Sequence, residues 1–359
     1  MRFNSKYLNL KTIYIFFLFL ALLNIFFSTD KVQGKTFIIN DIKISTPFEI
    51  NFDKKEIIDK GFIQAFDQLI LSIVRTQDQK KLIKIPISMI KGTIDTFSIK
   101  KEKFIDETYH LNLSVSFNKK KIFNLLQEKN IFPSLPIKKD IFFIPIVIEE
   151  DKNEILIFSE NYMFNNWNKI RKNYHLINYI LPTEDLEDLD LIKIKLDNLE
   201  DYDFQEIIDK YNLKDYIIMI VFKNTDRIKI LSKINLNNNL NIKTQNFKSQ
   251  NFKSQIEIEE FINKIKNVYE NYWKTKNQIN TSLKFPIIVS IDNNDNSKIS
   301  EFEKSVKALD FLYDFYIYKF DNKRNIYKII FNGSPENFLK TMNKNNYNFD
   351  TQNQIWTLR

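Results

Sequence analysis

The acidic stretch at residues 182–190 contains the side chains best suited to chemistry. It is rich in Asp and Glu and follows a predicted buried strand, which is where α/β sheets commonly bind ligands. The carboxylates of Asp185 and Asp188 would hold a cation or a polar ligand, which makes Pro182, Asp185 and Asp188 candidate residues of a ligand loop. The alternative is structural, because the same acids would cap a short helix and stabilise its positive end.

A second candidate, a calcium loop, begins at Asp292. Oxygen-bearing side chains occupy its first, third, fifth and twelfth positions, the last being Glu303, which is the spacing of a calcium-binding loop. However, Ser297 stands at the sixth position, where such loops require glycine, and a strand enters the loop instead of a helix. The alternative is an ordinary strand-to-helix turn that is capped by Asn296 or Ser297.

Other kinds of catalytic or metal site lack the residues they need. The chain has only two histidines, His110 and His175, no cysteine and four scattered glycines. Nucleophilic triads usually need a histidine base within a suitable motif, and transition-metal cages need clustered His or Cys. We therefore expect both histidines to be surface or cap residues. The sequence predicts no catalytic residue, no metal and no cofactor.

The first 34 residues have the pattern of a secretory signal peptide. A basic start precedes the apolar run Ile13–Phe27, and the small residues Val32 and Gly34 follow it two apart. This pattern predicts cleavage after Gly34 and a periplasmic location. The alternative is an uncleaved signal anchor in the inner membrane, since the apolar run approaches the length of a spanning helix. The chain has no cysteine to carry a lipid, which argues against a lipoprotein.

The net charge of +8 does not indicate a nucleic-acid partner. Nucleic-acid binders cluster their cations on one face or in one tract, whereas here Lys and Arg alternate with Asp and Glu along most segments. We expect an envelope protein or a cell-wall component as the partner and no nucleic acid. Contact with the membrane is expected only through the N-terminal segment, if it is uncleaved.

Patterns of apolar residues predict three small mixed-sheet domains in tandem, of the α+β or α/β class. Residues 35–140 form the first, with strands at 94–104 and 109–117 and helices at 54–74 and 119–129. Pro133 and Pro136 mark its end. Residues 281–359 form the last, a ferredoxin-like βαββαβ unit.

Residues 141–280 are predicted as a middle α/β domain. Its strands at 141–148 and 216–222 are continuously apolar, as expected of strands buried on both faces. A peripheral strand at 227–235 precedes an inserted polar loop near 235–255, where a five-residue segment is duplicated. The duplication is most simply an expanded surface loop. The functional alternative is that Phe247 and Phe252 bind a ligand by aromatic stacking. A long amphipathic helix follows at 256–276.

Two stretches of the chain have a recognisable pattern, namely Tyr109–Asn118 and the Pro-x-x-Asp-x-x-Asp stretch at Pro182, Asp185 and Asp188. In these stretches and in several others the chain resembles an uncharacterised family from Gram-negative bacteria, the domain of unknown function 2066 proteins. The resemblance covers most of the chain after residue 34, but only the Pro-x-x-Asp-x-x-Asp stretch is motif-like. The chain departs from the family in its low Gly and Ala content and in the duplicated loop. The family has no assigned activity, so the resemblance implies a cellular location and a fold but not a reaction. The residues that carry it are Gly61, Ala65, Tyr109–Asn118, Ile144, Pro145, Trp167, Leu181, Pro182, Asp185, Asp188 and the C-terminal unit.

These observations lead to one expected function and two alternatives. The first is a non-catalytic exported module that binds or organises components of the cell envelope. The second is a periplasmic protein that binds a small ligand or a cation through the Asp185 and Asp188 loop. The third is an unrecognised carboxylate-based hydrolase, which would need two acids, drawn from Glu184, Asp185 and Asp188, facing each other in a pocket.

Overall fold

The computed structural model describes residues 36–49, 52–249, 252, 254–309 and 311–359. The signal segment predicted for residues 1–34, with its cleavage site at Gly34, lies outside these ranges. The chain divides into two compact units, which contain Phe37–Lys284 and Phe285–Arg359. Helices and mixed sheets occur in both units, which confirms the predicted α+β architecture of small mixed-sheet domains in tandem. Among the described helices, none combines the length and the apolar character needed to cross a membrane.

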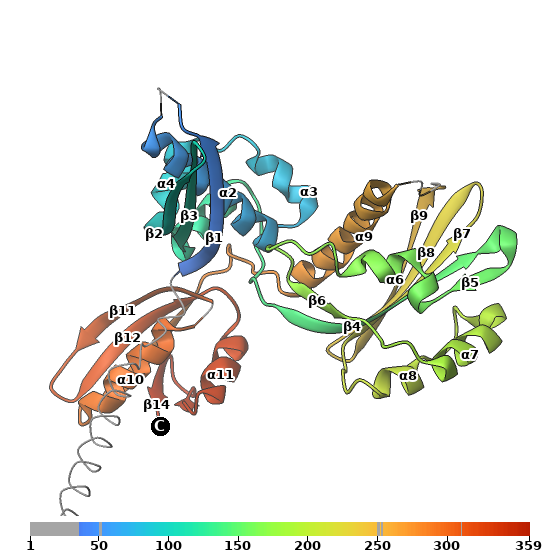
Figure 1. Ribbon diagram of the computed structural model, residues 1–359. Helices are drawn as coiled ribbons and strands as arrows, with labels where there is room; N and C mark the ends of the chain where they lie inside the picture. The colour runs from blue at the N-terminus through green and yellow to red at the C-terminus, as the bar shows by residue number, and fades with distance from the viewer. Residues whose placement is uncertain (1–35, 50–51, 250–251, 253, 310) are drawn as a thin grey trace, which may run out of the picture. The chain divides into compact units, whose positions relative to one another are not determined.

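The N-terminal part of the larger unit is a three-stranded sheet with helices packed on one face (Figure 1). Its elements are β1 (Thr36–Pro47), α2 (Lys54–Ile73), α3 (Thr76–Gln79), α4 (Ile87–Thr93), β2 (Ile94–Ile105), β3 (Thr108–Asn118) and α5 (Lys119–Glu128). The strand order is β1-β3-β2, and β2 and β3 pair antiparallel. Alternate residues of β3 are apolar and buried, so that one face of the sheet packs against the helices.

Gly61 lets α2 approach this sheet closely. A Cβ atom added at Gly61 would clash with Leu113 Cδ1 and lie 2.9 Å from Ile44 Cδ1. Replacing Gly61 with valine should therefore lower the free energy of unfolding by about 1–3 kcal/mol, because overpacking forces neighbouring side chains to move. Gly92 of α4 is the matched control, since no atom lies within 4 Å of its added Cβ. Urea unfolding of both valine variants tests this, and equal stability of the two would contradict it.

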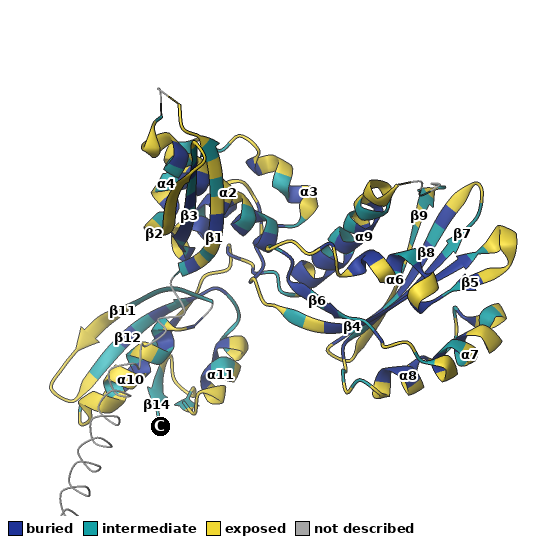
Figure 2. Cartoon of the chain, in the orientation of Figure 1, coloured by how far each residue is buried: buried dark blue, intermediate teal, exposed yellow. Residues whose placement is uncertain are grey.

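The rest of the larger unit is a six-stranded mixed sheet with helices on both faces (Figure 1). Its elements are β4 (Lys139–Glu149), β5 (Glu154–Leu156), α6 (Tyr162–Trp167), β6 (Ile177–Ile180), α7 (Leu186–Ile194), α8 (Gln205–Asp209), β7 (Tyr216–Lys223), β8 (Arg227–Leu236), β9 (Asn239–Lys248) and α9 (Gln255–Lys276). The strand order is β5-β4-β7-β8-β9, and β6 also pairs with β4. One core lies under α6 and α9 and the other under α7 and α8, which explains the continuously apolar strands β4 and β7. Figure 2 shows buried residues along β7 and β8.

Two predictions for this sheet were wrong. The strand at 227–235 is not peripheral, because β8 pairs with β7 on one side and with β9 on the other. The segment near 235–255 is not simply a polar loop, because β9 occupies ten residues of it and pairs with β8 along its length. β9 is an edge strand that is held by backbone hydrogen bonds, so its side chains can be polar and exposed.

The two duplicated phenylalanines contribute to packing. The rings of Phe247 and Phe252 each lie 5.2 Å, between centroids, from the ring of Phe261 in α9. Phe252 also lies 5.1 Å from the ring of Tyr162 in α6. Both rings are half-buried and pack against the core under α6 and α9, which is a structural role rather than that of an open stacking surface.

The smaller unit is a five-stranded sheet with its own hydrophobic core. Its elements are β10 (Phe285–Asp292), α10 (Asn296–Lys307), β11 (Leu312–Phe320), β12 (Arg324–Phe331), α11 (Pro335–Lys344), β13 (Phe349–Asp350) and β14 (Ile355–Leu358). The strand order is β11-β12-β10-β14-β13. The predicted βαββαβ sequence of elements is present, with the two-residue strand β13 added before the last strand. β14 runs parallel to β10, whereas β12 runs antiparallel to it.

Candidate functional site

The carboxylates of the predicted ligand loop converge on one lysine. Lys210 Nζ donates to Asp185 Oδ2 at 2.9 Å and to Asp188 Oδ1 at 2.6 Å. Asp185 also caps α7 by accepting a hydrogen bond from Glu187 N, and the side chain of Asp188 is only 1% exposed. Glu184 is exposed and Pro182 is buried. Lys210 pairs with both carboxylates, so the geometry is that of a helix cap with an ion pair.

The predicted calcium loop is also a helix cap. Asp295, rather than Asn296 or Ser297, caps α10 by accepting hydrogen bonds from two backbone N–H groups, the first at 2.9 Å. Asp292, the first residue of the predicted loop, forms an ion pair with Arg324 at 3.4 Å. Across the residues that the structure describes, no group of three His, Cys, Asp or Glu side chains is placed to hold a metal ion.

The two histidines have different environments. His110 lies on the polar face of the N-terminal sheet, with its Nδ1 2.8 Å from Ser45 Oγ. His175 is only 8% exposed, so a surface position was wrong for it. Its Nδ1 accepts a hydrogen bond from Lys172 N at 3.4 Å, so it caps the turn before β6, as the other part of the prediction expected. It lies in the loop between α6 and β6, which the long helix α9 covers. That helix also contains three charged residues that are buried.

Three side chains of α9 are buried although they are charged. Lys266, Glu270 and Lys274 follow one another at intervals of four residues and are 2%, 3% and 4% exposed. This spacing places them on one face of the helix. Lys266 Nζ donates to Trp167 O and Ile170 O, both at 2.7 Å, and so fixes the end of α6. Buried charges require such partners, because desolvation of an unpaired ion is costly.

Glu270 fixes the next part of the same loop. Its carboxylate accepts hydrogen bonds from Leu176 N and Ile177 N at 3.0 Å. Burial raises the pKa of Glu270 above its usual value, against the opposing effects of these N–H groups and of Lys274 and Lys266. Burial lowers the pKa of each of the two lysines to about 8. The carboxylate therefore anchors the loop and offsets part of the charge of the two buried lysines.

Lys274 connects the same helix to the N-terminal sheet. Its Nζ donates to Leu71 O and Val74 O, the carbonyl groups at the C-terminal end of α2. Such a bond satisfies carbonyls that a helix end leaves free. One turn earlier on α9, Asn271 Oδ1 accepts a hydrogen bond from Thr76 N at 2.9 Å. Through these contacts α9 holds α2 and the loop before β6 in fixed positions within one compact unit.

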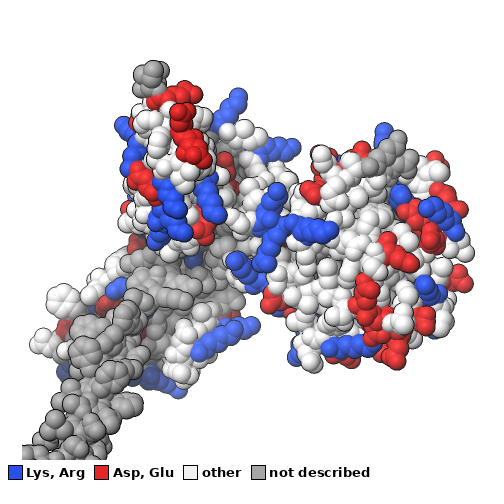
Figure 3. Space-filling view, viewed as in Figure 1, with Lys and Arg blue, Asp and Glu red and all other residues white. Residues whose placement is uncertain are grey.

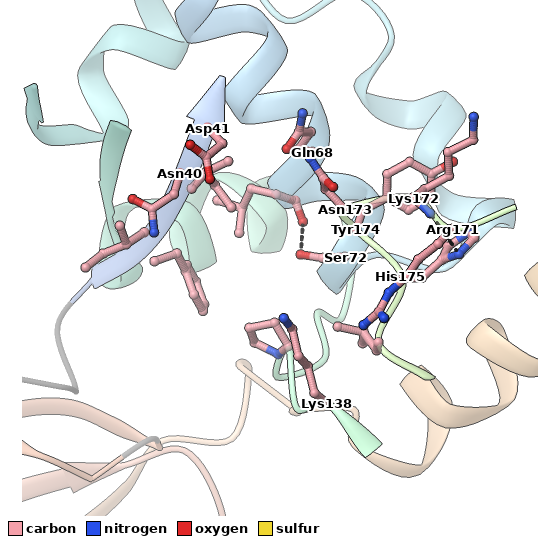
Figure 4. A pocket seen from close by; sticks show the side chains of 16 residues that line it. Asn40, Asp41, Gln68, Ser72, Lys138, Arg171, Lys172, Asn173, Tyr174 and His175 are labelled. Atoms are coloured by element: carbon pink, nitrogen blue, oxygen red, sulfur yellow. Dashed lines mark hydrogen bonds between the residues drawn. The ribbon is translucent and has the colours of Figure 1, made fainter. Parts of the chain in front are cut away.

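A cleft of about 580 Å³ lies between the two parts that α9 holds. Residues 37–41 of β1 and Gln68, Leu69 and Ser72 of α2 line one side, and residues 171–176 line the other. Figure 4 shows Asn40 and Asp41 opposite Arg171, Lys172 and His175. We call this cavity the β1 cleft. Its volume lies within the range of small-molecule binding sites, about 300–1,000 Å³.

The β1 cleft is rich in cations. Lys138, Arg171 and Lys172 line it and are exposed, and within the described ranges none of them forms an ion pair with an acidic side chain. Figure 3 shows Lys and Arg side chains gathered over this part of the unit, between the N-terminal helices and α6. Asp41 is the acidic residue of the lining, and its Oδ1 accepts a hydrogen bond from Asn112. The cleft therefore attracts anionic groups.

His175 makes stability depend on pH. Burial, and then the nearby cations Lys266, Lys274, Lys172 and Arg171, lower the pKa of His175 to about 4, whereas an unfolded histidine has a pKa of about 6.5. Between these values the unfolded chain binds more protons. The unfolding free energy should therefore fall as the pH drops from 6.5 towards 4, by up to about 2 kcal/mol after allowance for solvent screening.

Urea unfolding at pH 7 and pH 5 measures this effect. The variant His175→Gln isolates the contribution of the histidine, because all the carboxylates are the same in both proteins. The wild type should lose more stability than the variant between the two pH values. Equal losses in the two proteins would show that His175 does not control this dependence.

Sequence reasoning did not find the β1 cleft or the charged face of α9. The cleft brings together segments near residues 40, 70, 138 and 173, which no local pattern connects. The charged face could have been inferred from the sequence, because Lys266, Glu270 and Lys274 lie beside the apolar stripe of α9 that includes Ile262 and Tyr269. Charges that extend a buried stripe at intervals of four indicate buried polar contacts rather than a solvated surface.

No protein-family model matches the chain, and no curated protein matches it. The resemblance to the envelope family of unknown function therefore stays a prediction. The functional proposal rests on the geometry of the chain.

Proposed function

We propose that the chain is a non-catalytic exported protein of the cell envelope that binds another envelope component through the β1 cleft. The observation that carries this proposal is the set of three cations, Lys138, Arg171 and Lys172, which line the cleft without acidic partners in the described structure. Cations that serve only solubility are usually spread among acids on a surface. Here they converge on a cavity beside an exposed strand.

The rigidity of the cleft supports the same proposal. The loop that contains residues 171–176 is held at its start by Lys266, through Ile170 O, and at its end by Glu270, through Leu176 N, and α2 is held by Lys274. Both sides of the cleft are thus fixed to one helix before any partner arrives. A preorganised site loses less conformational entropy on binding, which strengthens the affinity that a given set of contacts provides.

Export is the other half of the proposal, and N-terminal sequencing tests it. Protein recovered from fractionated cells should be periplasmic and should begin at Lys35, because residues 1–34 have the pattern of a cleaved signal. A membrane-bound form that begins at Met1 would support the uncleaved anchor instead. A cytoplasmic form that begins at Met1 would contradict export.

Charge reversal tests the binding site. The variant Arg171→Glu with Lys172→Glu should lose the envelope components that co-purify with the wild type after crosslinking of intact cells. The matched control reverses Lys193 and Lys195, two exposed lysines near the end of α7. Both variants should unfold like the wild type. Retention of the same crosslinked components by the cleft variant would overturn the proposal.

A further inference from the structure

Among the residues that the structure describes, β1 has a free edge, and this edge faces the β1 cleft. Within the described residues, β1 pairs with β3 and with no other strand. Residues 37–41 of β1 line the cleft, on the side opposite β3. An edge strand presents unpaired backbone N–H and C=O groups, which makes it a template for another extended chain. The cleft therefore offers a partner both cations and a row of backbone hydrogen-bonding groups.

The backbone limits the length of this edge. Asp41 has a φ of 58°, in the left-handed region, whereas a regular strand needs an extended backbone at each residue. The regular edge in the cleft therefore covers the four residues 37–40, or about 13 Å at the usual rise of a strand. A short segment of a partner chain is the occupant that matches this length.

The side chains around the edge indicate the composition of that segment. Ile38 is 60% exposed on β1, so an apolar side chain of an added strand could pack beside it. Lys138, Arg171 and Lys172 lie across the cleft and attract acidic side chains. Successive residues of a strand point to opposite faces, so alternation of acidic and apolar residues would satisfy both features.

We propose that the β1 cleft binds an extended acidic segment of a partner protein, which adds to the free edge of β1 as a further strand. This inference rests on the proposed function and names the occupant of the same site. Affinity would come from backbone hydrogen bonds along residues 37–40, and the three cations would select acidic sequences. A strand in this position would also cover an edge that is otherwise open to unwanted pairing.

Peptides with modified backbones test the strand addition directly. The probe is a labelled eight-residue peptide of alternating Glu and Val, titrated against the purified full chain by fluorescence anisotropy. Two further peptides carry N-methyl groups on either the odd or the even residues. Alternate N–H groups of an added strand face β1, so one methylated peptide should bind about tenfold or more weakly and the other should bind like the parent.

Charge variants and a polymer without a peptide backbone complete the test. Reversal of Arg171 and Lys172 should weaken binding of the parent peptide about tenfold, while reversal of Lys193 and Lys195 should not change it. Polyacrylate should bind more weakly than the peptide. Equal binding by both methylated peptides, or by polyacrylate, would overturn strand addition. Absence of peptide binding would also overturn it. In all three cases the proposed function would stand if the cleft variant still loses its crosslinked components in cells.

Discussion

Replacing Glu270 with alanine is expected to lower the free energy of unfolding by about 3–5 kcal/mol. The carboxylate is 3% exposed and accepts hydrogen bonds from Leu176 N and Ile177 N. Its loss leaves two buried N–H donors without a partner and two buried cations, Lys266 and Lys274, without a compensating charge. Both effects are unfavourable, since unsatisfied buried donors and uncompensated buried charges each destabilise a folded protein.

Urea unfolding measures the loss for Glu270→Ala, and Glu260→Gln on the exposed side of α9 is the control. The control should lie within about 0.5 kcal/mol of the wild type, as surface substitutions usually do. Amide hydrogen exchange gives a second readout, because Leu176 and Ile177 should lose protection in the alanine variant alone. Unchanged stability together with unchanged exchange at these two amides would show that the carboxylate does not anchor the loop.

Replacing Trp167 with alanine is expected to cost about 3–5 kcal/mol of unfolding free energy. Its side chain is fully buried at the end of α6, and its ring lies 4.1 Å from the ring of Phe143 and 5.4 Å from that of Tyr179. Alanine would leave a cavity among rigid aromatic neighbours, which cannot collapse to fill it. Lys266 Nζ, 5.4 Å from the ring centroid, would also lose a cation–π contact.

The matched control for this position is Trp167→Phe. Phenylalanine keeps most of the aromatic packing and removes the indole N–H, which has no hydrogen-bond partner in the described structure. It should therefore cost less than half of the alanine loss, because the cost of truncation rises with the volume of the cavity left behind. Thermal and urea unfolding of both variants test the pair. A phenylalanine variant as unstable as the alanine variant would contradict a loss caused by the cavity.

Much of the fold was predictable because apolar periodicity specifies strongly amphipathic or fully buried elements. The alternating residues of β3 and the stripe of α9 gave correct elements, as did the continuous apolar runs of β4 and β7. β9 was not predictable in the same way, because an edge strand of Asn, Lys and Gln has no apolar pattern. Its position is determined by backbone pairing with β8, which depends on the tertiary structure.

The candidate site was less accessible to sequence reasoning than the fold. The acidic loop at Asp185 and Asp188 stood out in the sequence, but Lys210, which pairs with both acids, is more than twenty residues away and gave no local signal. The β1 cleft depends on long-range contacts, such as that between Lys274 and Val74. Local spacing can identify charged residues, but only the fold determines which of them acquire partners.

The most direct test of the central claim is photo-crosslinking from the β1 cleft in living cells. A photoreactive residue replaces Gln68, which lines the cleft, or Lys193, which is exposed near the end of α7. The account predicts a discrete adduct with an envelope protein from position 68, absent from position 193 and lost when Arg171 and Lys172 are reversed. Adducts of equal yield from both positions, or an adduct that survives the charge reversal, would contradict it.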